Sequence, residues 1–298
     1  TLTIYITGNG SVNKNPNLPK YPPGTIVTLT ALPEQGWQFS HWSGDLSGST
    51  NPQNITMNSN KIVYANFILC EYTLTLTTNG TGTGTIQASP PGPTYTHGTI
   101  VTIWANATTG STFTGFTGDL TGTQTPQNLT MNSNKNVNAE FTINQYTLTL
   151  TTNGTGTGTI QASPPGPTYT HGTIVTIWAN ATTGSTFTGF TGDLTGTQTP
   201  QNLTMNSNKN VNAEFTINQY TLTINIQGNG TVNQNPNQTT YPYGTIVTLT
   251  ALPEQGWTFS HWSGDLSGSN NPENITMDDN KTVTAHFSLN EYTITINI

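Results

Sequence analysis

Four asparagines stand at equivalent places along the chain, each at the head of an Asn-X-Thr tripeptide. This tripeptide is the acceptor motif for N-linked glycans, which attach to the side-chain amide in secreted proteins. The sequence therefore predicts one candidate glycosylation site in each copy of a repeat, and the candidates are Asn54, Asn128, Asn202 and Asn274. Because Asn and Thr are abundant, chance motifs also occur, as at Asn106 and Asn280.

Four tryptophans are candidates for exposed aromatic contacts: Trp37, Trp104, Trp178 and Trp257. An indole on a β-face with polar groups nearby is a common platform for sugars. The same ring can instead pack between repeats or between subunits. The sequence favours the packing role and leaves glycan binding open.

Charged residues recur in two short motifs. Asp45, Asp119, Asp193 and Asp265 lie in Ser/Thr-Gly-Asp-Leu-Ser/Thr-Gly, and Lys61, Lys135, Lys209 and Lys281 lie in an Asn/Asp-rich turn. A lone acid between small residues most simply caps turn amides. A calcium site would need several oxygen ligands, and this motif offers one carboxylate. We expect turn-capping by the aspartates and solvent exposure of the lysines.

Histidine gives no sign of catalysis or metal binding. None of His41, His97, His171, His261 and His286 recurs in all four copies, and none has zinc-ligand or triad-like spacing. We expect these side chains to face solvent or lie in turns. The sequence predicts no catalytic residue, no metal and no cofactor.

These residues belong to a tandem array. Residues 72–145 recur without any change as residues 146–219, and diverged copies flank the pair. We expect repeat 1 at 1–71, repeat 2 at 72–145, repeat 3 at 146–219, repeat 4 at 220–291, and the first strand of a further repeat at 292–298. An array of this kind repeats one unit for length or for multivalency, whereas an enzyme keeps one active site.

Composition excludes several classes of protein. The chain has 298 residues, a formal net charge of −7 and only six basic side chains, all lysine. Without arginine, the phosphate-neutralising interactions that dominate nucleic-acid affinity are missing. No stretch approaches the roughly 20 apolar residues of a membrane span. The single cysteine, Cys70, cannot form an internal disulfide framework and is expected to be an incidental linker residue.

Each repeat is predicted to be all-β, because apolar and polar residues alternate with period two between Gly, Pro and Asn punctuation. In repeat 2 we expect strands near 72–77, 85–88, 99–105, 128–131 and 136–141, the last returning after a turn at 132–135. The expected core of repeat 1 is Leu2, Ile4, Val12, Val27, Leu29, Phe39, Trp42, Ile55, Met57, Val63 and Phe67.

Two further expectations concern packing. Only about four residues separate the last strand of one repeat from the first strand of the next, so neighbouring repeats should pack into a stiff, elongated rod. Repeats 1 and 4 carry Trp37 and Trp257 where repeats 2 and 3 carry Trp104 and Trp178 on the preceding strand. This exchange predicts that the two positions face each other across a hairpin and share one patch.

The repeated strings Tyr-Thr-Leu-Thr, Gly-Thr-Ile-Val-Thr and Gly-Trp-x-Phe-Ser-x-Trp-Ser-Gly-Asp resemble the divergent internalin-type B-repeat family. The resemblance covers essentially the whole chain, although both tryptophans of the last string are replaced in repeats 2 and 3, by Ser111 and Phe116 and by Ser185 and Phe190. It implies tandem modules in secreted or surface proteins and brings no catalytic residues. Some relatives have a ubiquitin-like grasp fold with a helix; this sequence favours an all-β version, sandwich-like or grasp-like.

The leading hypothesis is a non-catalytic segment of an extracellular fibre, filament or adhesin stalk at the cell surface, with other copies of itself as partners. The alternatives are a multivalent array that binds cell-surface polysaccharide, and a non-catalytic appendage of a large secreted enzyme. Residues 291–298 form an alternating strand that could be donated to a neighbouring chain. A longer array that continues past this strand is the favoured account.

Overall fold

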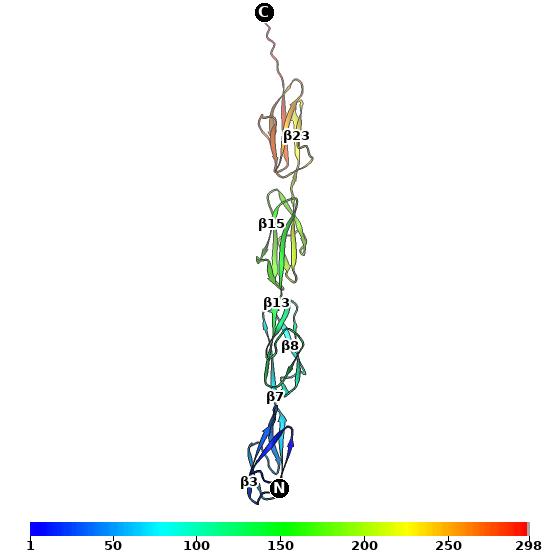
Figure 1. The fold of residues 1–298 in the computed structure, drawn as a ribbon. Helices are drawn as coiled ribbons and strands as arrows, with labels where there is room; N and C mark the ends of the chain where they lie inside the picture. Colours follow the sequence, from blue (N-terminus) through cyan, green and yellow to red (C-terminus); the bar gives the residue numbers. More distant parts are fainter. Residues whose placement is uncertain (297–298) are drawn as a thin grey trace. The chain divides into compact units, whose positions relative to one another are not determined.

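The computed structural model describes residues 1–296, which are built of β-strands without any helix (Figure 1). The chain divides into two compact units, Thr1–Asn144 and a second that begins at Gln145, and each unit holds two repeats. Among the described residues there is no helix that could cross a membrane. The fold is an all-β array of four repeated modules, as the sequence predicts.

Repeat 1 has two three-stranded sheets, ordered β1-β6-β4 and β2-β3-β5. The strands are β1 (Leu2–Thr7), β2 (Gly10–Asn15), β3 (Thr25–Pro33), β4 (Trp37–Gly44), β5 (Gln53–Met57) and β6 (Lys61–Leu69). Repeat 4 has the same arrangement, with sheets β22-β28-β26 and β23-β25-β27 and a short β21-β24 pair. Its strands are β21 (Gln219–Tyr220), β22 (Leu222–Gln227), β23 (Gly230–Asn235), β24 (Tyr241–Pro242), β25 (Thr245–Pro253), β26 (Trp257–Gly264), β27 (Glu273–Met277) and β28 (Lys281–Leu289).

Repeats 2 and 3 add one short strand to the first sheet, giving β11-β13-β7-β9 with β12-β10-β8, and β16-β14-β20-β18 with β15-β17-β19. The strands of repeat 2 are β7 (Glu71–Gly80), β8 (Gly84–Ser89), β9 (Thr94–Thr96), β10 (Ile100–Ala107), β11 (Ser111–Gly118), β12 (Gln127–Thr130) and β13 (Lys135–Ile143). Those of repeat 3 are β14 (Gln145–Gly154), β15 (Gly158–Ser163), β16 (Thr168–Thr170), β17 (Ile174–Ala181), β18 (Ser185–Gly192), β19 (Gln201–Thr204) and β20 (Lys209–Ile217).

In every repeat the first long strand lies beside the last and runs parallel to it. β1 pairs with β6 from Leu2 opposite Lys61 to Thr7 opposite Asn66, and β7–β13, β14–β20 and β22–β28 pair in the same way. The last strand also pairs with the antiparallel strand that begins at Trp37, Ser111, Ser185 or Trp257, so it is an inner strand of its sheet. The parallel ladder therefore closes each repeat on itself.

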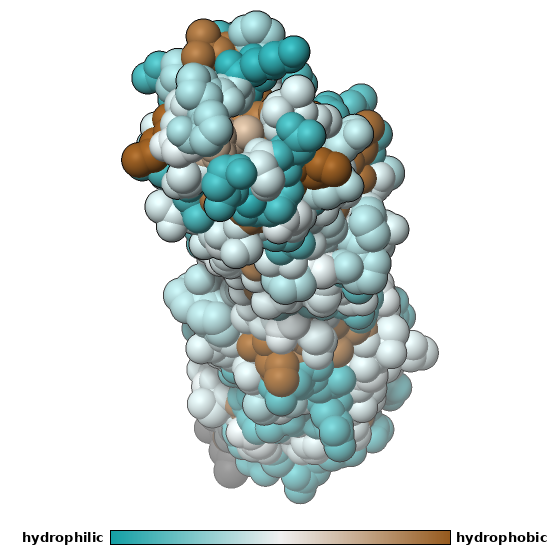
Figure 2. Space-filling model, turned by 90° about the horizontal axis from the view of Figure 1, so that it is seen from below, coloured by the Kyte–Doolittle hydropathy of each residue, from teal (hydrophilic) through white to brown (hydrophobic). Residues whose placement is uncertain are grey.

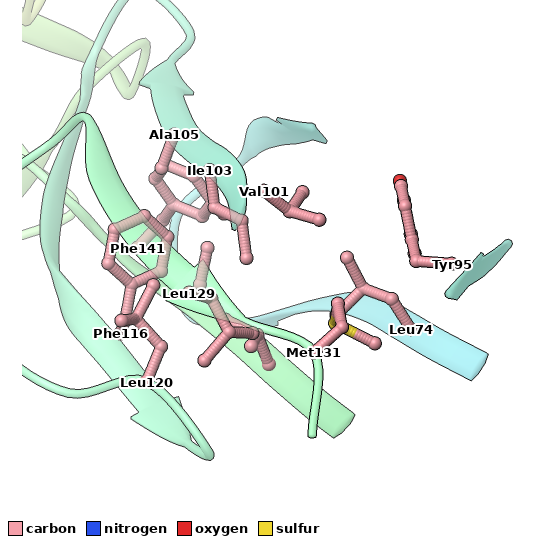
Figure 3. Packing of buried hydrophobic residues seen from close by; sticks show 12 residues of the cluster. Leu74, Tyr95, Val101, Ile103, Ala105, Phe116, Leu120, Leu129, Met131 and Phe141 are labelled. Carbon is pink, nitrogen blue, oxygen red and sulfur yellow. The ribbon is translucent and has the colours of Figure 1, made fainter. Parts of the chain in front are cut away.

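The hydrophobic core lies between the two sheets, because period-two alternation turns one side of every strand toward the other sheet. Figure 3 shows this cluster in repeat 2, where Val101, Ile103 and Phe141 are fully buried. Every predicted core residue of repeat 1 belongs to the corresponding cluster, either buried or half-buried. The core prediction is confirmed, and the cluster also contains Ala31, Leu46 and Ala65.

The predicted hairpins are wrong. β12 pairs with β10, whereas β13 pairs with β7 and β11, so the turn at 132–135 carries the chain from one sheet to the other. Likewise β3 and β4 belong to different sheets. Alternation defines which face of a strand is apolar, but two strands joined by a short turn need not be hydrogen-bonded neighbours.

Outside the cores the surface is polar and nearly uncharged, in keeping with 6% charged residues. Figure 2 shows mostly pale and teal residues with separate brown, hydrophobic groups. Residues 291–296 belong to no strand, and Tyr292, Ile294 and Ile296 are exposed. The predicted strand at 292–298 is thus unpaired over its described part, and residues 297–298 lie outside the described residues.

Candidate functional site

A one-residue linker joins the repeats within each unit, and both of its backbone polar groups are hydrogen-bonded. The N–H of Cys70 donates to the carbonyl of Gly36 in repeat 1 at 2.8 Å, and the Cys70 carbonyl accepts from the N–H of His97 in repeat 2 at 2.8 Å. In repeats 3 and 4, Asn218 does the same with Gly184 and Tyr243, at 2.8 and 2.9 Å. Cys70 therefore occupies a structural position, and its role there comes from the backbone.

A ring from the second repeat covers a glycine of the first at both junctions. Gly36 has φ +81°, and a Cβ added there would overlap the imidazole of His97; a Cβ at Gly184 would overlap the ring of Tyr243. His97 also packs edge-on against Tyr72, with centroids 5.9 Å apart. Its Nδ1 is buried without a hydrogen-bond partner in the described part of the chain. His97 lies in a turn, which is one of the two places expected for the histidines, and it is half-buried there because its ring packs on Gly36 of repeat 1.

A cavity of about 590 Å³ opens beside the first junction. Its lining residues are Gln38, Ile68, Leu69, Cys70, Glu71, Tyr72 and Thr96. Burial, followed by the adjoining Cys70 thiol, raises the pKa of Tyr72. The cavity holds no catalytic constellation, and no group of three or more His, Cys, Asp or Glu side chains that could hold a metal ion occurs within residues 1–296.

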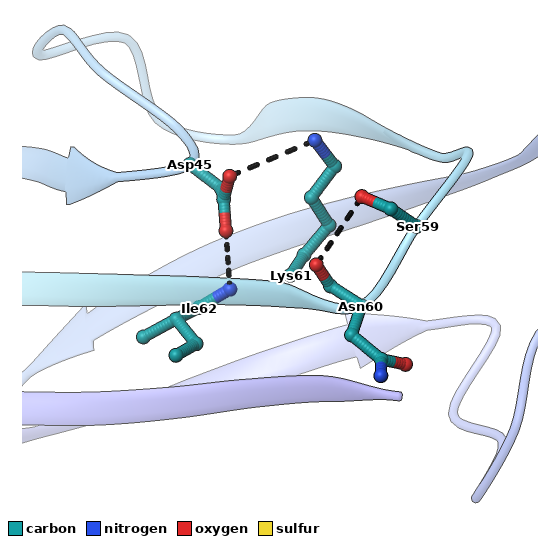
Figure 4. A network of polar contacts seen from close by, with 5 residues as sticks. All are labelled: Asp45, Ser59, Asn60, Lys61 and Ile62. Carbon is teal, nitrogen blue, oxygen red and sulfur yellow. Dashed lines mark hydrogen bonds and ion pairs between the residues drawn. The ribbon is translucent and has the colours of Figure 1, made fainter.

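The recurring aspartates tie two strands of one sheet together. Asp45 Oδ2 accepts from the backbone N–H of Ile62 at 2.6 Å (Figure 4), while its own N–H donates to the Ile62 carbonyl at 2.8 Å. Asp119, Asp193 and Asp265 make the same side-chain bond to Asn136, Asn210 and Thr282. Each carboxylate thus binds the amide of the last strand, where the sequence suggested amides of its own turn.

A lysine completes this network in three repeats. The distance from the lysine Nζ to the aspartate Oδ1 is 3.6 Å for Lys61 and Asp45, 3.4 Å for Lys135 and Asp119, and 3.6 Å for Lys209 and Asp193. The three lysine side chains are only 16–18% exposed. Lys281 instead pairs with Asp278 at 2.6 Å. The expectation of exposed turn lysines is therefore wrong, because the strand that follows the turn carries the side chain back toward the aspartate.

This network predicts a pH dependence. The backbone N–H of Asn136, assisted by Lys135, lowers the pKa of Asp119. A lowered folded-state pKa stabilises the fold above the unfolded pKa of about 3.9, and that stabilisation is lost as pH falls through the lower folded value. Asp119→Asn should therefore lower the melting temperature at neutral pH, and the difference from wild type should shrink as the pH falls.

Calorimetry of the full chain between pH 2 and 7 tests this expectation. The control is Glu34→Gln, which changes an exposed acid of repeat 1. An Asp119→Asn offset that is the same at every pH would show that the carboxylate charge contributes nothing.

The four tryptophans fall into two kinds. Trp37 and Trp257 are half-buried against the cores of repeats 1 and 4, on the same strand face as Phe39 and Phe259. Trp104 and Trp178 lie on strands of the other sheet and donate through Nε1 to Gln87 at 3.0 Å and to Gln161 at 2.9 Å. The two positions therefore do not share a patch, and Trp37 and Trp257 are core residues.

The glycosylation candidates share one geometry. Asn54, Asn128, Asn202 and Asn274 are exposed on strands at the edge of the second sheet. Each Oδ1 accepts from a threonine hydroxyl of the neighbouring strand at 2.7–2.8 Å, from Thr28, Thr102, Thr176 and Thr248. This leaves the amide nitrogen, the atom that would carry a glycan, on the exposed side chain; glycosylation stays a prediction.

Small two-sheet modules joined by one-residue linkers define a tandem-repeat protein. The chain belongs to the divergent InlB B-repeat domain family, whose profile matches residues 1–69, 74–145, 148–219 and 220–291. This confirms the resemblance seen in the sequence.

Solved structures show only distant likeness. The TIE protein of Bacillus anthracis is 10% identical with a TM-score of 0.43, over 90% of this chain and 60% of that one, so the chain spans less than two thirds of that relative. A mutant of the major pilin from Streptococcus pyogenes is 11% identical with a TM-score of 0.13, over 73% and 97% of the two chains. No curated protein matches the chain.

Proposed function

We propose that this chain is a non-catalytic structural segment of an extracellular fibre, filament or adhesin stalk at a cell surface. The junction between repeats supports this proposal most directly. Within each unit, the backbone of the linker residue is hydrogen-bonded to both repeats, and a ring of the second repeat covers a glycine of the first. Such a joint restricts bending, which suits a spacer. The unchanged duplication of residues 72–145 supports selection for length over a specialised site.

Small-angle scattering tests this proposal. We expect the maximum dimension of the particle to grow linearly from residues 1–144 to residues 1–296, because each added repeat should extend the same rod. The chain ending at residue 144 is a compact unit and serves as the two-repeat standard. A maximum dimension that grows much less than the added length would reject the stalk.

A further inference from the structure

A small depression of about 310 Å³ lies beside the indole of Trp104 in repeat 2. Its other lining residues are Leu76, Gln87, Ala88, Pro91 and Gly92. None of these side chains is charged, and Trp104 is half-buried. The site combines an aromatic ring, aliphatic contacts and one carboxamide.

The carboxamide fixes the ring. Gln87 Oε1 accepts the indole N–H at 3.0 Å, which restrains both side chains and leaves the amide Nε2 without a partner in residues 1–296. A restrained ring loses less conformational entropy when a ligand packs on it. The amide nitrogen is a hydrogen-bond donor that a ligand hydroxyl can satisfy.

Repeats 1 and 4 show that the fold does not need this pair. Trp104 pairs with Gln87 across β10 and β8, and the corresponding residues are Thr30 with Asn13 in repeat 1 and Thr250 with Asn233 in repeat 4. Both members of the pair change together. Repeat 3 keeps the complete set, as Leu150, Gln161, Ala162, Pro165, Gly166 and Trp178. The indole and its carboxamide are thus an addition to a scaffold that folds without them.

We propose that this depression, in repeat 2 and in its identical copy in repeat 3, binds an uncharged sugar ring of a polysaccharide. A pyranose offers an apolar C–H face that packs on an indole and hydroxyls that pair with an amide. The absence of any charged lining residue favours a neutral saccharide over an acidic one. The proposal goes beyond the structural role, which needs no ligand.

Two identical weak sites on one chain give avidity. When one site holds a polymer, the second meets the next sugar units at a raised effective concentration. Removing one site should therefore weaken retention by a polysaccharide much more than twofold. The number of short oligosaccharide molecules bound per chain should only be halved.

Affinity electrophoresis of the full chain in gels containing soluble β-glucan, mannan or galactan tests the proposal. The Trp104→Thr/Trp178→Thr variant installs the residue that repeats 1 and 4 carry at this position. We expect it to lose retardation by about 10-fold or more, as for removal of a central aromatic contact. Gln87→Asn/Gln161→Asn should weaken retardation in the same gel.

Trp37→Phe/Trp257→Phe is the control, because it removes two indoles outside the depression and keeps an aromatic ring against the cores of repeats 1 and 4. It should keep wild-type retardation. If the wild-type chain is retarded in no gel, or if the Trp104→Thr/Trp178→Thr variant is retarded as strongly as wild type, the proposal is overturned. Neither outcome bears on the proposed stalk function, which is tested by the maximum dimension of the particle in small-angle scattering.

Discussion

Replacing Trp42 with alanine should unfold repeat 1 while the other repeats stay folded. The indole is 1% exposed in the centre of the core, and its Nε1 donates to the Thr50 carbonyl at 3.0 Å. Truncating a buried aromatic side chain of this size costs about 3–5 kcal/mol. That loss is a large part of the stability of a small module, because whole domains reach only about 5–15 kcal/mol.

Hydrogen exchange read by mass spectrometry is the suitable measurement, because β4 and β6 of repeat 1 differ in sequence from the corresponding strands of every other repeat. Protection should disappear in β4 and β6 and persist in β26 and β28. The control is Ile62→Thr, an exposed position where repeat 4 carries Thr282, with an expected change of at most about 0.5 kcal/mol. Equal loss of protection in all four repeats would show that the modules do not fold as separate units.

A second large effect is expected at the junction, where two equivalent glycines provide a matched pair. Gly36→Ala forces a Cβ into a residue with φ +81° and into the ring of His97. Gly256→Ala meets the same backbone strain at φ +83°, but no atom lies within 4 Å of the added carbon. The strain costs about 1–2 kcal/mol at both sites, and the overlap adds about 1–3 kcal/mol at Gly36 alone.

The readout is exchange of the linker amides, since Cys70 donates to Gly36 and Asn290 donates to Gly256. Gly36→Ala should speed exchange at Cys70 well beyond the change at Asn290 in Gly256→Ala. Equal changes would mean that the ring of His97 moves aside freely and contributes nothing to the joint.

The sequence predicted the core well because inward positions alternate within each strand. Val27, Leu29 and Phe67 could be assigned to the core without knowledge of their partners, and all are buried. The same alternation places Trp37 beside Phe39 on the inner face, so its burial was readable from the sequence. The prediction that the Trp37 and Trp104 positions share one patch led instead to Trp37 being expected among the exposed aromatic residues.

Strand partners could not be read in this way. β1 and β6 are separated by most of a repeat, and nothing local in either strand specifies a parallel ladder. The junction was equally hidden, because Gly36 and His97 lie in different repeats. One signal existed: a ring stands before the Gly-Thr-Ile-Val string in repeats 2, 3 and 4, as His97, His171 and Tyr243, but repeat 1 has Pro23 there.

The parallel pairing of first and last strands has a mechanical consequence. Tension enters a repeat at the start of its first strand and leaves at the end of its last, so it pulls these two neighbours lengthwise past each other. In β7 and β13 the ladder runs from Leu74 opposite Lys135 to Gly80 opposite Phe141. Sliding the strands strains these bonds together in shear, whereas an antiparallel pair joined by a hairpin would unzip one bond at a time. A stretching force therefore loads all the hydrogen bonds between the first and last strands of a module at the same time.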